Sequence, residues 1–476
     1  MKRVFVFGVF NVLHPGHIRL FRFAKECGDE LTVVVQSDEV SNNKAIYVKE
    51  DLRLEVIQSN SYVDHSFLSS DTIEELVKKN KPDIVVKGRE YENRKNHEYE
   101  IIKSYGGELL FDSGGIIFSS LELLKNEAKN EIENINLPYL YMDRHNIKSS
   151  DLIRDIKKFS ELTVTIIGDL IMDEYITCDP IGMSQEDPTL VVTPIDHKLF
   201  IGGAGIVASH AAGLGANVNF ISVVGPDSTG NKAEDKLREM GVNKHLIIDN
   251  HRPTTLKKRY RCQGKTLLRV SRMHQRDVSR EIQNELIERL ESVMHTTDLL
   301  VFSDFNYGVL TDFVINKIID LANKNKVYVV ADSQSSSQVG DVSRYEKINM
   351  LTPTEREARI SIQDHNSGLI VLAEKLRVKT QANNILLKLG RDGVIVHAEN
   401  NGGKDFLTDR VEAINKNPKD VSGAGDSMLI TASMLLTVGG NIWSAALLGS
   451  VAAGLQVARI GNQPLKAKEL IQLLQQ

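Results

Sequence analysis

Two histidines near the start of the chain stand at a spacing that could stabilise a developing negative charge. His14 and His17 close the segment Gly8-Val9-Phe10-Asn11-Val12-Leu13-His14-Pro15-Gly16-His17, which lies between a short apolar run and an amphipathic stretch. If the apolar run is a strand and the amphipathic stretch is a helix, both imidazoles can face an anion at the helix N-terminus. Nucleotidyl transfer needs such charge neutralisation more than a covalent nucleophile. The spacing alone equally allows two histidines that only cap a helix.

A single aspartate near the other end of the chain could act as a base. Asp426 lies in Asp420-Val421-Ser422-Gly423-Ala424-Gly425-Asp426-Ser427, at the start of a long segment without charge. Small residues before a helix expose backbone N–H groups that can hold a phosphate or an oxyanion. A carboxylate beside them could accept the proton of a substrate hydroxyl during phosphoryl transfer. The alternative is that Asp426 is only the N-cap of the helix.

The elements that must position these residues alternate between strands and helices. The runs Arg3–Phe7, Leu31–Gln36, Ile84–Lys87 and Glu108–Phe111 are short and β-rich, and helical stretches separate them. The same alternation returns after Leu162 on a larger scale, which indicates parallel sheets covered on both faces. We therefore predict an α/β protein with two doubly wound domains, at residues 1–128 and 161–476, joined by a polar linker at 129–160.

Two further patterns refine the larger domain. Thr189–Thr193 and Lys257–Val270 are strand-like but fall outside the βα alternation, which predicts a separate small β sheet. Ser427–Ala458 carries no charge and is long enough to span a bilayer. Gly439-Gly440-Asn441 interrupts it, so two buried helices joined by a turn are the better interpretation.

Composition excludes several classes of protein. The chain has 476 residues, 41% of them hydrophobic and 25% charged, which is typical of a globular protein. Its 58 basic and 63 acidic residues give a net charge of −5, so no global field attracts nucleic acid. Three scattered cysteines support neither a disulfide framework nor a zinc site. We expect a cytoplasmic protein with no nucleic-acid or membrane partner.

The first constellation resembles the GxFDxxHxGH signature of the cytidylyltransferase-like nucleotidyltransferases, across roughly Met1 to Lys125. The resemblance implies a small Rossmann-like fold in which His14, His17 and Lys44 are catalytic. It also implies nucleotide contacts from Gly8, Phe10, Arg53, Lys87, Gly88, Ser119 and Ser120. Asn11 replaces the usual Asp of the signature, and Leu121 replaces a Thr that would contact phosphate. The motif does not choose between ATP and CTP.

The second constellation resembles the DTxGAGD signature of the ribokinase-family sugar kinases, over about Leu162 to Gln476. The resemblance implies a ribokinase-like fold with a small β lid and Asp426 as the base. It implies ATP-side contacts from Gly390, Gly393, Gly423, Ala424 and Gly425. It implies sugar contacts from Asp169, Asp173, Gly202, Gly203 and Asp304. Glu357 falls on the Asn-x-x-Glu associated with Mg²⁺, although Thr354 stands in place of the Asn.

Within that family the heptose-7-phosphate kinases of ADP-heptose synthesis are the most similar. Those kinases occur fused to an HxGH nucleotidyltransferase, and here the order of the two domains is reversed. Ile206 stands where they have Asn, and Tyr307 and Gln334 stand where they have Lys. Because Ile206 cannot bind a hydroxyl, we expect a less polar sugar than heptose 7-phosphate. The alternative is that the basic stretch Lys257–Arg269 takes over the phosphate.

Together the resemblances imply a bifunctional enzyme of nucleotide-activated sugar synthesis. MgATP would phosphorylate a sugar phosphate at its anomeric hydroxyl, and a second NTP, ATP or CTP, would supply a nucleotidyl group. A homo-oligomer, as a dimer, is expected. Two alternatives stay open: activation of another sugar or alditol phosphate with CTP, or the loss of catalysis in one domain, which would then act as a binding module.

Overall fold

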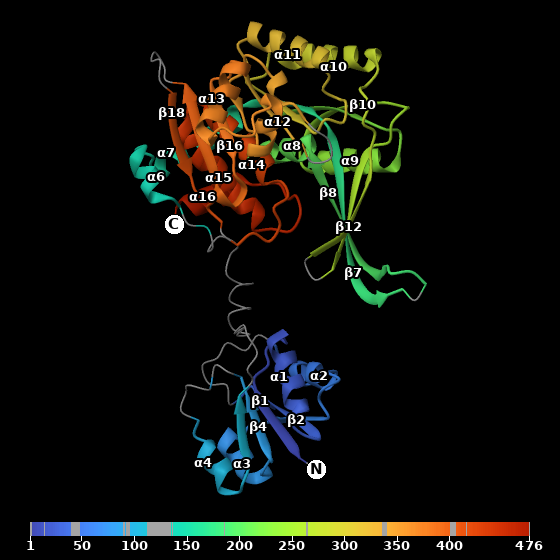
Figure 1. Ribbon diagram of the computed structural model, residues 1–476, viewed down its shortest axis with the longest axis vertical. Helices are drawn as coiled ribbons and strands as arrows, with labels where there is room; N and C mark the ends of the chain where they lie inside the picture. The colour runs from blue at the N-terminus through green and yellow to red at the C-terminus, as the bar shows by residue number, and fades with distance from the viewer. Residues whose placement is uncertain are drawn as a thin grey trace. The chain divides into compact units, whose positions relative to one another are not determined.

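The computed structural model describes residues 2–13, 15–39, 48–88, 91, 96–111, 135, 137–184, 186–262, 265–335, 340–399, 406–415 and 417–475. The chain forms two compact units, Met1–Asn130 and Glu131–Gln476 (Figure 1). Both are α/β, as the alternation of strands and helices predicts.

The small unit is built on a parallel sheet whose described strands lie in the order β3-β2-β1-β4-β5. These strands are β1 (Arg3–Gly8), β2 (Glu30–Gln36), β3 (His65–Ser69), β4 (Ile84–Lys87) and β5 (Glu108–Phe111). The helices are α1 (Pro15–Glu26), α2 (Glu50–Gln58), α3 (Ile73–Asn80) and α4 (Tyr99–Ser104). The central strands carry apolar runs, such as Val4–Phe7 and Val33–Val35, because helices cover both faces of the sheet. The strand order reverses between β1 and β4, and ligands bind at the carboxyl ends of strands at such a point.

The large unit contains a long, mostly parallel sheet in the order β10-β9-β6-β13-β14-β15-β16-β17-β18. Its strands are β6 (Thr163–Gly168), β9 (Asn217–Val224), β10 (Asn243–Ile248), β13 (Leu299–Asp304), β14 (Tyr328–Ser333), β15 (Met350–Leu351), β16 (Asn384–Lys388), β17 (Val394–Glu399) and β18 (Phe406–Val411). β17 and β18 run antiparallel to their neighbours.

Two layers of helices cover this sheet. One layer comprises α7 (Ser149–Lys157), α8 (Ala204–Gly213), α9 (Ser228–Glu239), α14 (Ala424–Thr437), α15 (Ile442–Val457) and α16 (Ala467–Leu474). The other comprises α10 (Arg280–Met294), α11 (Asp312–Lys324), α12 (Glu355–Ile362) and α13 (Leu369–Thr380). Along β13, Leu299 and Val301 join the first core while Leu300 and Phe302 join the second. The alternating direction of strand side chains therefore divides the core in two.

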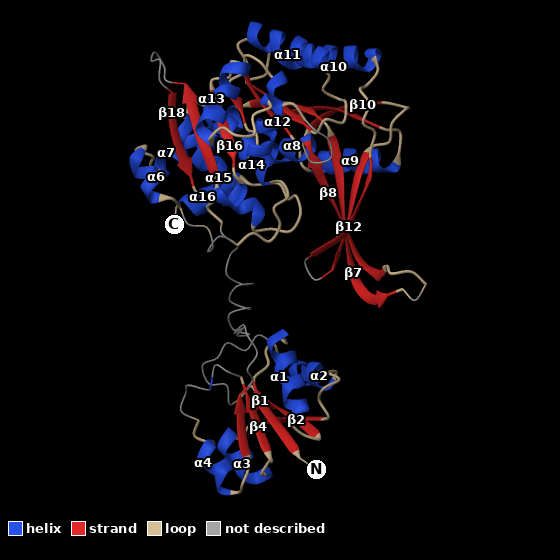
Figure 2. Ribbon diagram, in the orientation of Figure 1, coloured by secondary structure: helices blue, strands red, loops and turns tan. Residues whose placement is uncertain are grey.

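A second sheet, in the order β12-β11-β7-β8, projects from the large unit and is called the lid below (Figure 2). Its strands are β7 (Leu170–Met183), β8 (Leu190–Gly203), β11 (Thr255–Cys262) and β12 (Lys265–Arg272). This is the small β sheet expected from the sequence. It is larger than expected, because β7 follows β6 after a single residue and no turn signal separates them.

The linker expected at residues 129–160 is, in its second half, part of the large unit. The segment holds α6 (Tyr139–Arg144), α7 and a 3₁₀ turn at Lys158–Glu161. Tyr141, Leu152, Ile156 and Phe159 are buried in the large core. The His145 ring stacks on Trp443 with centroids 4.2 Å apart. Sequence alone misses this packing because the apolar residues are spread thinly among polar ones.

The charge-free segment forms α14 and α15 with a turn between them, as predicted. Both helices are buried on almost every side, which removes the need for polar residues. In the part of the chain that the structure describes, no helix is both long and apolar enough to cross a membrane.

Candidate active sites

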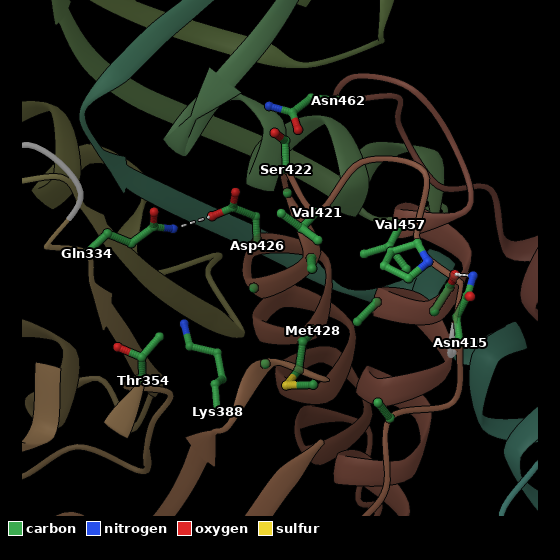
Figure 3. Close-up of a pocket in the computed structure, with 18 of the residues that line it drawn as sticks. Gln334, Thr354, Lys388, Asn415, Val421, Ser422, Asp426, Met428, Val457 and Asn462 are labelled. Carbon is green, nitrogen blue, oxygen red and sulfur yellow. Dashed lines mark hydrogen bonds between the residues drawn. The ribbon is translucent and has the colours of Figure 1, made fainter. Parts of the chain in front are cut away.

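A cavity of about 690 Å³ opens in the large unit where the lid, the ends of the sheet strands and the start of α14 meet (Figure 3). Its polar walls come from Asp173 on β7, Lys257 and Arg259 on β11, Gln334 after β14, Lys388 at the end of β16 and Asp426 on α14. Strands that end at one edge of a parallel sheet bring such residues together from distant parts of the sequence.

Asp426 is the third residue of α14 and is buried in the wall of this cavity. The N-cap is Gly423, so the alternative that Asp426 only caps the helix is wrong. Gln334 donates a hydrogen bond from Nε2 to Asp426 Oδ1 at 3.0 Å. Burial raises the pKa of Asp426 to about 7, Asp332 adds to this rise and Lys388 opposes it. A carboxylate with a pKa near neutrality is well matched to act as a general base.

Asp173 and Gly203 lie on the lid side of the cavity. Arg259 Nη2 donates to Asp173 Oδ1 at 3.1 Å, which orients the carboxylate. A Cβ atom at Gly202 would lie 2.4 Å from Asp173 Oδ2, so only glycine lets the carboxylate lie this close to the backbone. The absence of a side chain at Gly202 therefore makes room for the Asp173 carboxylate.

Asp169 and Asp304, both expected to bind the sugar, lie behind the cavity wall. Asp169 Oδ2 accepts from the backbone N–H groups of Phe305 at 2.9 Å and Tyr307 at 3.3 Å. Burial, followed by the charge of Asp304, raises the pKa of Asp169 to about 6. Both aspartates therefore accept hydrogen bonds from the loop after β13, which differs from the direct sugar contact that the sequence suggested.

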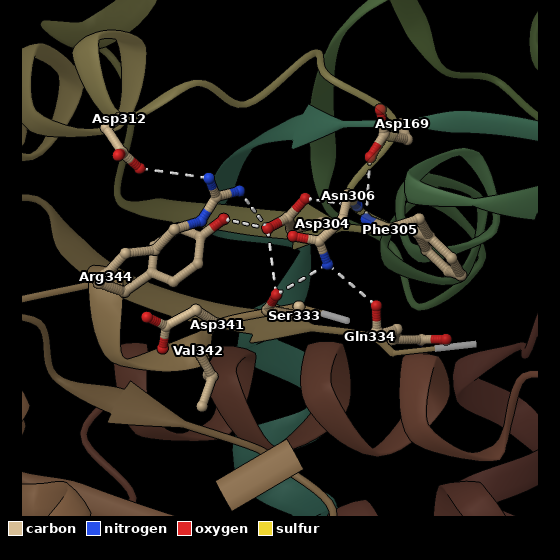
Figure 4. Close-up of polar contacts among 12 residues, drawn as sticks. Asp169, Asp304, Phe305, Asn306, Asp312, Ser333, Gln334, Asp341, Val342 and Arg344 are labelled. Carbon is tan, nitrogen blue, oxygen red and sulfur yellow. Dashed lines mark hydrogen bonds and ion pairs between the residues drawn. The ribbon is translucent and has the colours of Figure 1, made fainter. Parts of the chain in front are cut away.

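Asp304 is the centre of a buried polar network (Figure 4). Its Oδ2 accepts from Ser333 Oγ at 3.1 Å and from the Tyr345 hydroxyl at 2.9 Å, and it also contacts Arg344. Its Oδ1 accepts from the Asn306 N–H at 2.8 Å. With these partners the carboxylate holds the ends of β13 and β14 together beneath the site.

The substitutions relative to the heptose kinases do not remove sugar contacts in the expected way. Ile206 is fully buried in the core, and Tyr307 is 2% exposed. Gln334 does line the cavity, where it binds Asp426. Lys257 and Arg259 face the same space. The argument for a less polar sugar from Ile206 is therefore wrong, because this side chain does not reach the cavity.

The cavity also contains the small residues that the resemblance assigned to ATP. Its wall includes Gly390, Gly393, Gly423, Ala424 and Gly425. Apolar side chains line the same cavity, among them Ile414, Val421, Met428 and Val457. The sequence motifs missed Lys388, Asn415 and Asn462, which also line the cavity. Lys388 was detectable, because a charged residue that ends a buried strand faces the ligand edge of the sheet.

Glu357 also lines the cavity, and its carboxylate is held by backbone groups. Oε1 accepts from the Ser335 N–H at 2.9 Å and Oε2 from the Thr354 N–H at 2.7 Å. Thr354 caps α12 with its hydroxyl, which explains why threonine serves here. Among the described residues no group of three or more His, Cys, Asp or Glu side chains could hold a metal. Mg²⁺ commonly binds through one or two carboxylates, water and substrate phosphates, and this donor set fits that mode.

Four of the described residues expected at the small unit's site lie near the ends of β1 and β4, where the strand order reverses. Gly8 ends β1, Lys87 and Gly88 lie at the end of β4, and His17 is the third residue of α1. The Phe10 ring lies edge-on to the His17 ring, with centroids 5.2 Å apart. Lys87 Nζ donates to Asn96 Oδ1 at 2.7 Å and pairs with Glu98. His14, Lys44, Ser119 and Ser120 lie outside the described residues.

The structure explains why glycine stands at position 8 and phenylalanine at position 10, which the motif alone does not. A Cβ atom at Gly8 would lie 2.7 Å from the Phe10 ring, so glycine is required by this aromatic contact. Phe10 is buried in the core of the unit and has a φ of 50°. Phe10 therefore anchors the loop after β1 to the core of the small unit.

Arg53 is buried beneath the same loop, where a direct nucleotide contact is not available to it. Its Nε donates to the Val48 carbonyl and its Nη1 to the Gln36 carbonyl, both at 3.0 Å. Nη1 also contacts the Val9 carbonyl, and Nη2 contacts Asp38. The guanidinium thus joins the loop after β1 to the end of β2, which corrects the nucleotide-binding role expected from the sequence.

Arg53→Ala is therefore expected to destabilise the small unit by on the order of 3 kcal/mol, because several buried carbonyl groups lose their donor. The measurement is thermal unfolding followed by circular dichroism, with Arg22→Ala as the control. Arg22 forms an exposed pair with Glu26, so its loss costs little. An Arg53→Ala protein that melts normally but binds nucleotide poorly would restore the direct role.

The comparisons with known proteins find two families along the chain. Residues 162–468 match the family model of the pfkB family carbohydrate kinases, and residues 5–156 match the cytidylyltransferase-like family. The chain is 31% identical over 339 residues to the bifunctional protein HldE of Desulfatibacillum aliphaticivorans, covering 70% of this chain and 66% of that protein. It is 31% identical over 316 residues to HldE of Helicobacter hepaticus, covering 65% and 63%. The chain thus spans slightly less than two thirds of these relatives.

Solved structures show the fold of the large unit. Ribokinase from Thermotoga maritima aligns with a TM-score of 0.53 at 18% identity, covering 66% of this chain and all of that one. Phosphofructokinase-2 from Escherichia coli aligns with a TM-score of 0.55 at 16% identity, covering 66% of this chain and 98% of that one.

Proposed function

Because this chain belongs to the pfkB family of carbohydrate kinases, we propose that its large unit transfers the γ-phosphoryl group of ATP to the anomeric hydroxyl of a sugar phosphate. The small unit then joins the resulting sugar 1-phosphate to the nucleotidyl group of an NTP and releases pyrophosphate. The observation that carries the proposal is the position of Asp426, buried in the wall of the cavity in the first turn of α14, directly after Gly423-Ala424-Gly425.

The two sides of the cavity suit the two substrates. Charge and hydrogen bonds for a sugar phosphate would come from Lys257, Arg259 and Asp173. Apolar surface for the nucleobase of ATP would come from Ile414, Val421 and Val457. Asp426 would accept the proton of the attacking hydroxyl. The N–H groups of the turn would stabilise the charge on the transferring phosphoryl group.

Mg²⁺ is proposed to enter with ATP. It would supply positive charge that neutralises the nucleotide phosphates. Glu357 would hold it from the protein side, through the carboxylate that Ser335 and Thr354 orient.

The proposed sugar carries a phosphate at its far end, as a heptose phosphate does. A second cavity of about 290 Å³ adjoins the first, and Arg259, Val421 and Ser422 line both. Arg261, Arg269 and Lys419 also line it, so basic groups outnumber its one carboxylate, Asp420. Phosphate needs charged donors, because hydrogen bonds between ionised groups are the strongest ones. This cluster therefore favours the alternative in which the basic stretch binds the phosphate.

Arg269→Ala is expected to raise the KM for heptose 7-phosphate by about 10–100-fold, the loss typical of one charge-assisted hydrogen bond. The KM of the same sugar without phosphate should stay within about twofold. Lys265→Ala is the matched control, because Lys265 lies on the same exposed strand but does not line the cavity. Equal losses for the phosphorylated and unphosphorylated sugars would contradict the subsite.

The test of the whole proposal follows two products in one reaction. The purified chain receives heptose 7-phosphate and MgATP, then CTP or further ATP, and ADP and pyrophosphate are measured separately. We expect sugar-dependent ADP release, followed by pyrophosphate release with one of the two nucleotides. ADP release at the same rate without the sugar would refute the kinase assignment. Pyrophosphate release at the same rate without the kinase product would refute the order of the two steps.

A further inference from the structure

Lys388 is a buried cation in the wall of the kinase cavity, and neither motif accounts for it. It ends β16, and its Nζ lies 3.0 Å from Asp332 Oδ1 and 2.8 Å from Asp332 Oδ2. The side chain of Lys388 is 12% exposed and that of Asp332 is 2% exposed. Lys388 lines the cavity, so the small exposed part faces the ligand space.

The ammonium group lies beside the turn that would bind the phosphoryl group. A Cβ atom at Gly425 would lie 3.2 Å from Lys388 Nζ, so the ammonium is next to this backbone. Figure 3 shows the lysine chain pointing into the cavity on the side of Asp426 and Gln334. The cation therefore lies beside the backbone at the start of α14, next to the residue that precedes the proposed base.

Lys388 keeps its charge in spite of its burial. Burial lowers its pKa, but the charges of Asp332, Glu357 and Asp426 outweigh this effect and leave the pKa raised. These carboxylates come from β14, α12 and α14, while Asp173 on β7 and Lys257 on β11 also act on Asp426. A site surrounded by carboxylates would repel a triphosphate without a positive charge at this point.

We propose that Lys388 is a catalytic residue of the kinase, whose ammonium contacts the transferring phosphoryl group while Asp332 holds it in place. The inference rests on the proposed function of the large unit. In the step, the anomeric oxygen forms a bond to the γ-phosphorus, and the bond from that phosphorus to the β–γ bridging oxygen breaks. ADP leaves with the electron pair, and the hydroxyl proton passes to Asp426. Lys388 keeps its protons and neutralises the charge on the equatorial oxygens.

The competing explanation is that Lys388 only neutralises Asp332. Removing one partner of a buried ion pair destabilises a protein, whereas replacing both partners with neutral residues is often tolerated. The two explanations therefore diverge in the double variant Lys388→Met/Asp332→Asn. If Lys388 only neutralises Asp332, the double variant regains both stability and activity. If Lys388 acts on the phosphoryl group, stability returns without activity.

The experiment measures melting temperature, kcat and the KM for ATP in Lys388→Met, Lys388→Arg, Asp332→Asn and the double variant. We expect Lys388→Met to lower kcat by about 100-fold with the KM for ATP within about threefold, as for loss of one transition-state donor. The double variant should melt above Lys388→Met and stay about 100-fold slow, and Lys388→Arg should retain at least tenfold more activity than Lys388→Met. The kinetic constants of each variant are measured well below its melting temperature. Even a variant with low stability is then folded during the assay.

Two controls separate this inference from the proposed function. Lys375→Met breaks a lysine–aspartate pair with Asp364 elsewhere in the same unit and should leave kcat unchanged. The unmodified chain must first show sugar-dependent ADP release, and its failure to do so would refute the proposed function. If the unmodified chain is active and the double variant recovers kcat to within about threefold, the role of Lys388 in the phosphoryl step is refuted.

Discussion

Asp426→Asn is expected to lower the kcat of sugar phosphorylation by roughly 10³–10⁴-fold, the upper part of the range for loss of a general base. Asparagine has nearly the same shape and keeps an oxygen that can accept from Gln334 Nε2, as Asp426 Oδ1 does at 3.0 Å. It cannot take a proton from the substrate hydroxyl. ATP binding should therefore be retained, which equilibrium titration with a nucleotide analogue can measure.

The same substitution is expected to stabilise the protein at neutral and alkaline pH. The pKa of Asp426 is about 7 in the folded chain, whereas an aspartate in water has a pKa of 3.8, so folding disfavours the ionised carboxylate. The unmodified protein therefore loses stability as pH rises from about 4 to about 7, and the asparagine variant escapes this loss. The difference in melting temperature, variant minus parent, should grow over that window and stay constant above it.

Activity supplies an independent check on the same group. A base with a pKa of about 7 should make the kcat of the unmodified kinase fall as pH drops below 7. Pyrophosphate release by the small unit is the control, because Asp426 belongs to the other unit. An asparagine variant that still turns over sugar within about tenfold of the parent would leave Asp426 without a role in proton transfer.

The features that could be predicted from the sequence are those with a short-range cause. Gly439-Gly440 interrupts the charge-free segment, and α14 and α15 form on its two sides. The small residues Gly423–Gly425 form the N-cap and the first two residues of α14, a helix start that their own sequence favours. In these cases neighbouring residues determine the conformation, so no knowledge of distant parts is needed.

The features that could not be predicted depend on which way a side chain points inside the fold. Asp304 and Asp173 both follow the family pattern, yet Asp304 is tied to Ser333 and Tyr345 while Asp173 faces the cavity. Arg53 has the residue type of a phosphate ligand but satisfies buried carbonyl groups. A motif shows which residue types stand at the strand ends. It does not show which way each side chain points, because the hydrogen-bond partners that fix this direction lie far away in the sequence.

The second large effect is expected in the small unit, where His17→Ala should lower nucleotidyl transfer by about 10²–10³-fold. His17 lies in the first turn of α1, next to the end of β1, where an imidazole can donate to the phosphate undergoing attack. Sugar phosphorylation by the same preparation should change by less than about twofold. His65→Ala is the matched control, since His65 is an exposed histidine on β3 of the same unit.

Loss of activity in His17→Ala has a competing cause, because the His17 ring also packs against Phe10 and stacks on Phe21, with ring centroids 6.5 Å apart in the second pair. His17→Phe separates the two causes: phenylalanine keeps an aromatic ring in this cluster but offers no N–H donor. If the imidazole acts on the phosphate, the phenylalanine variant melts like the parent and is as slow as the alanine variant. If packing is the whole role, the phenylalanine variant regains pyrophosphate release. If the alanine variant stays folded but loses both pyrophosphate and ADP release, the two sites are not separate, and the assignment of one reaction to each unit is wrong.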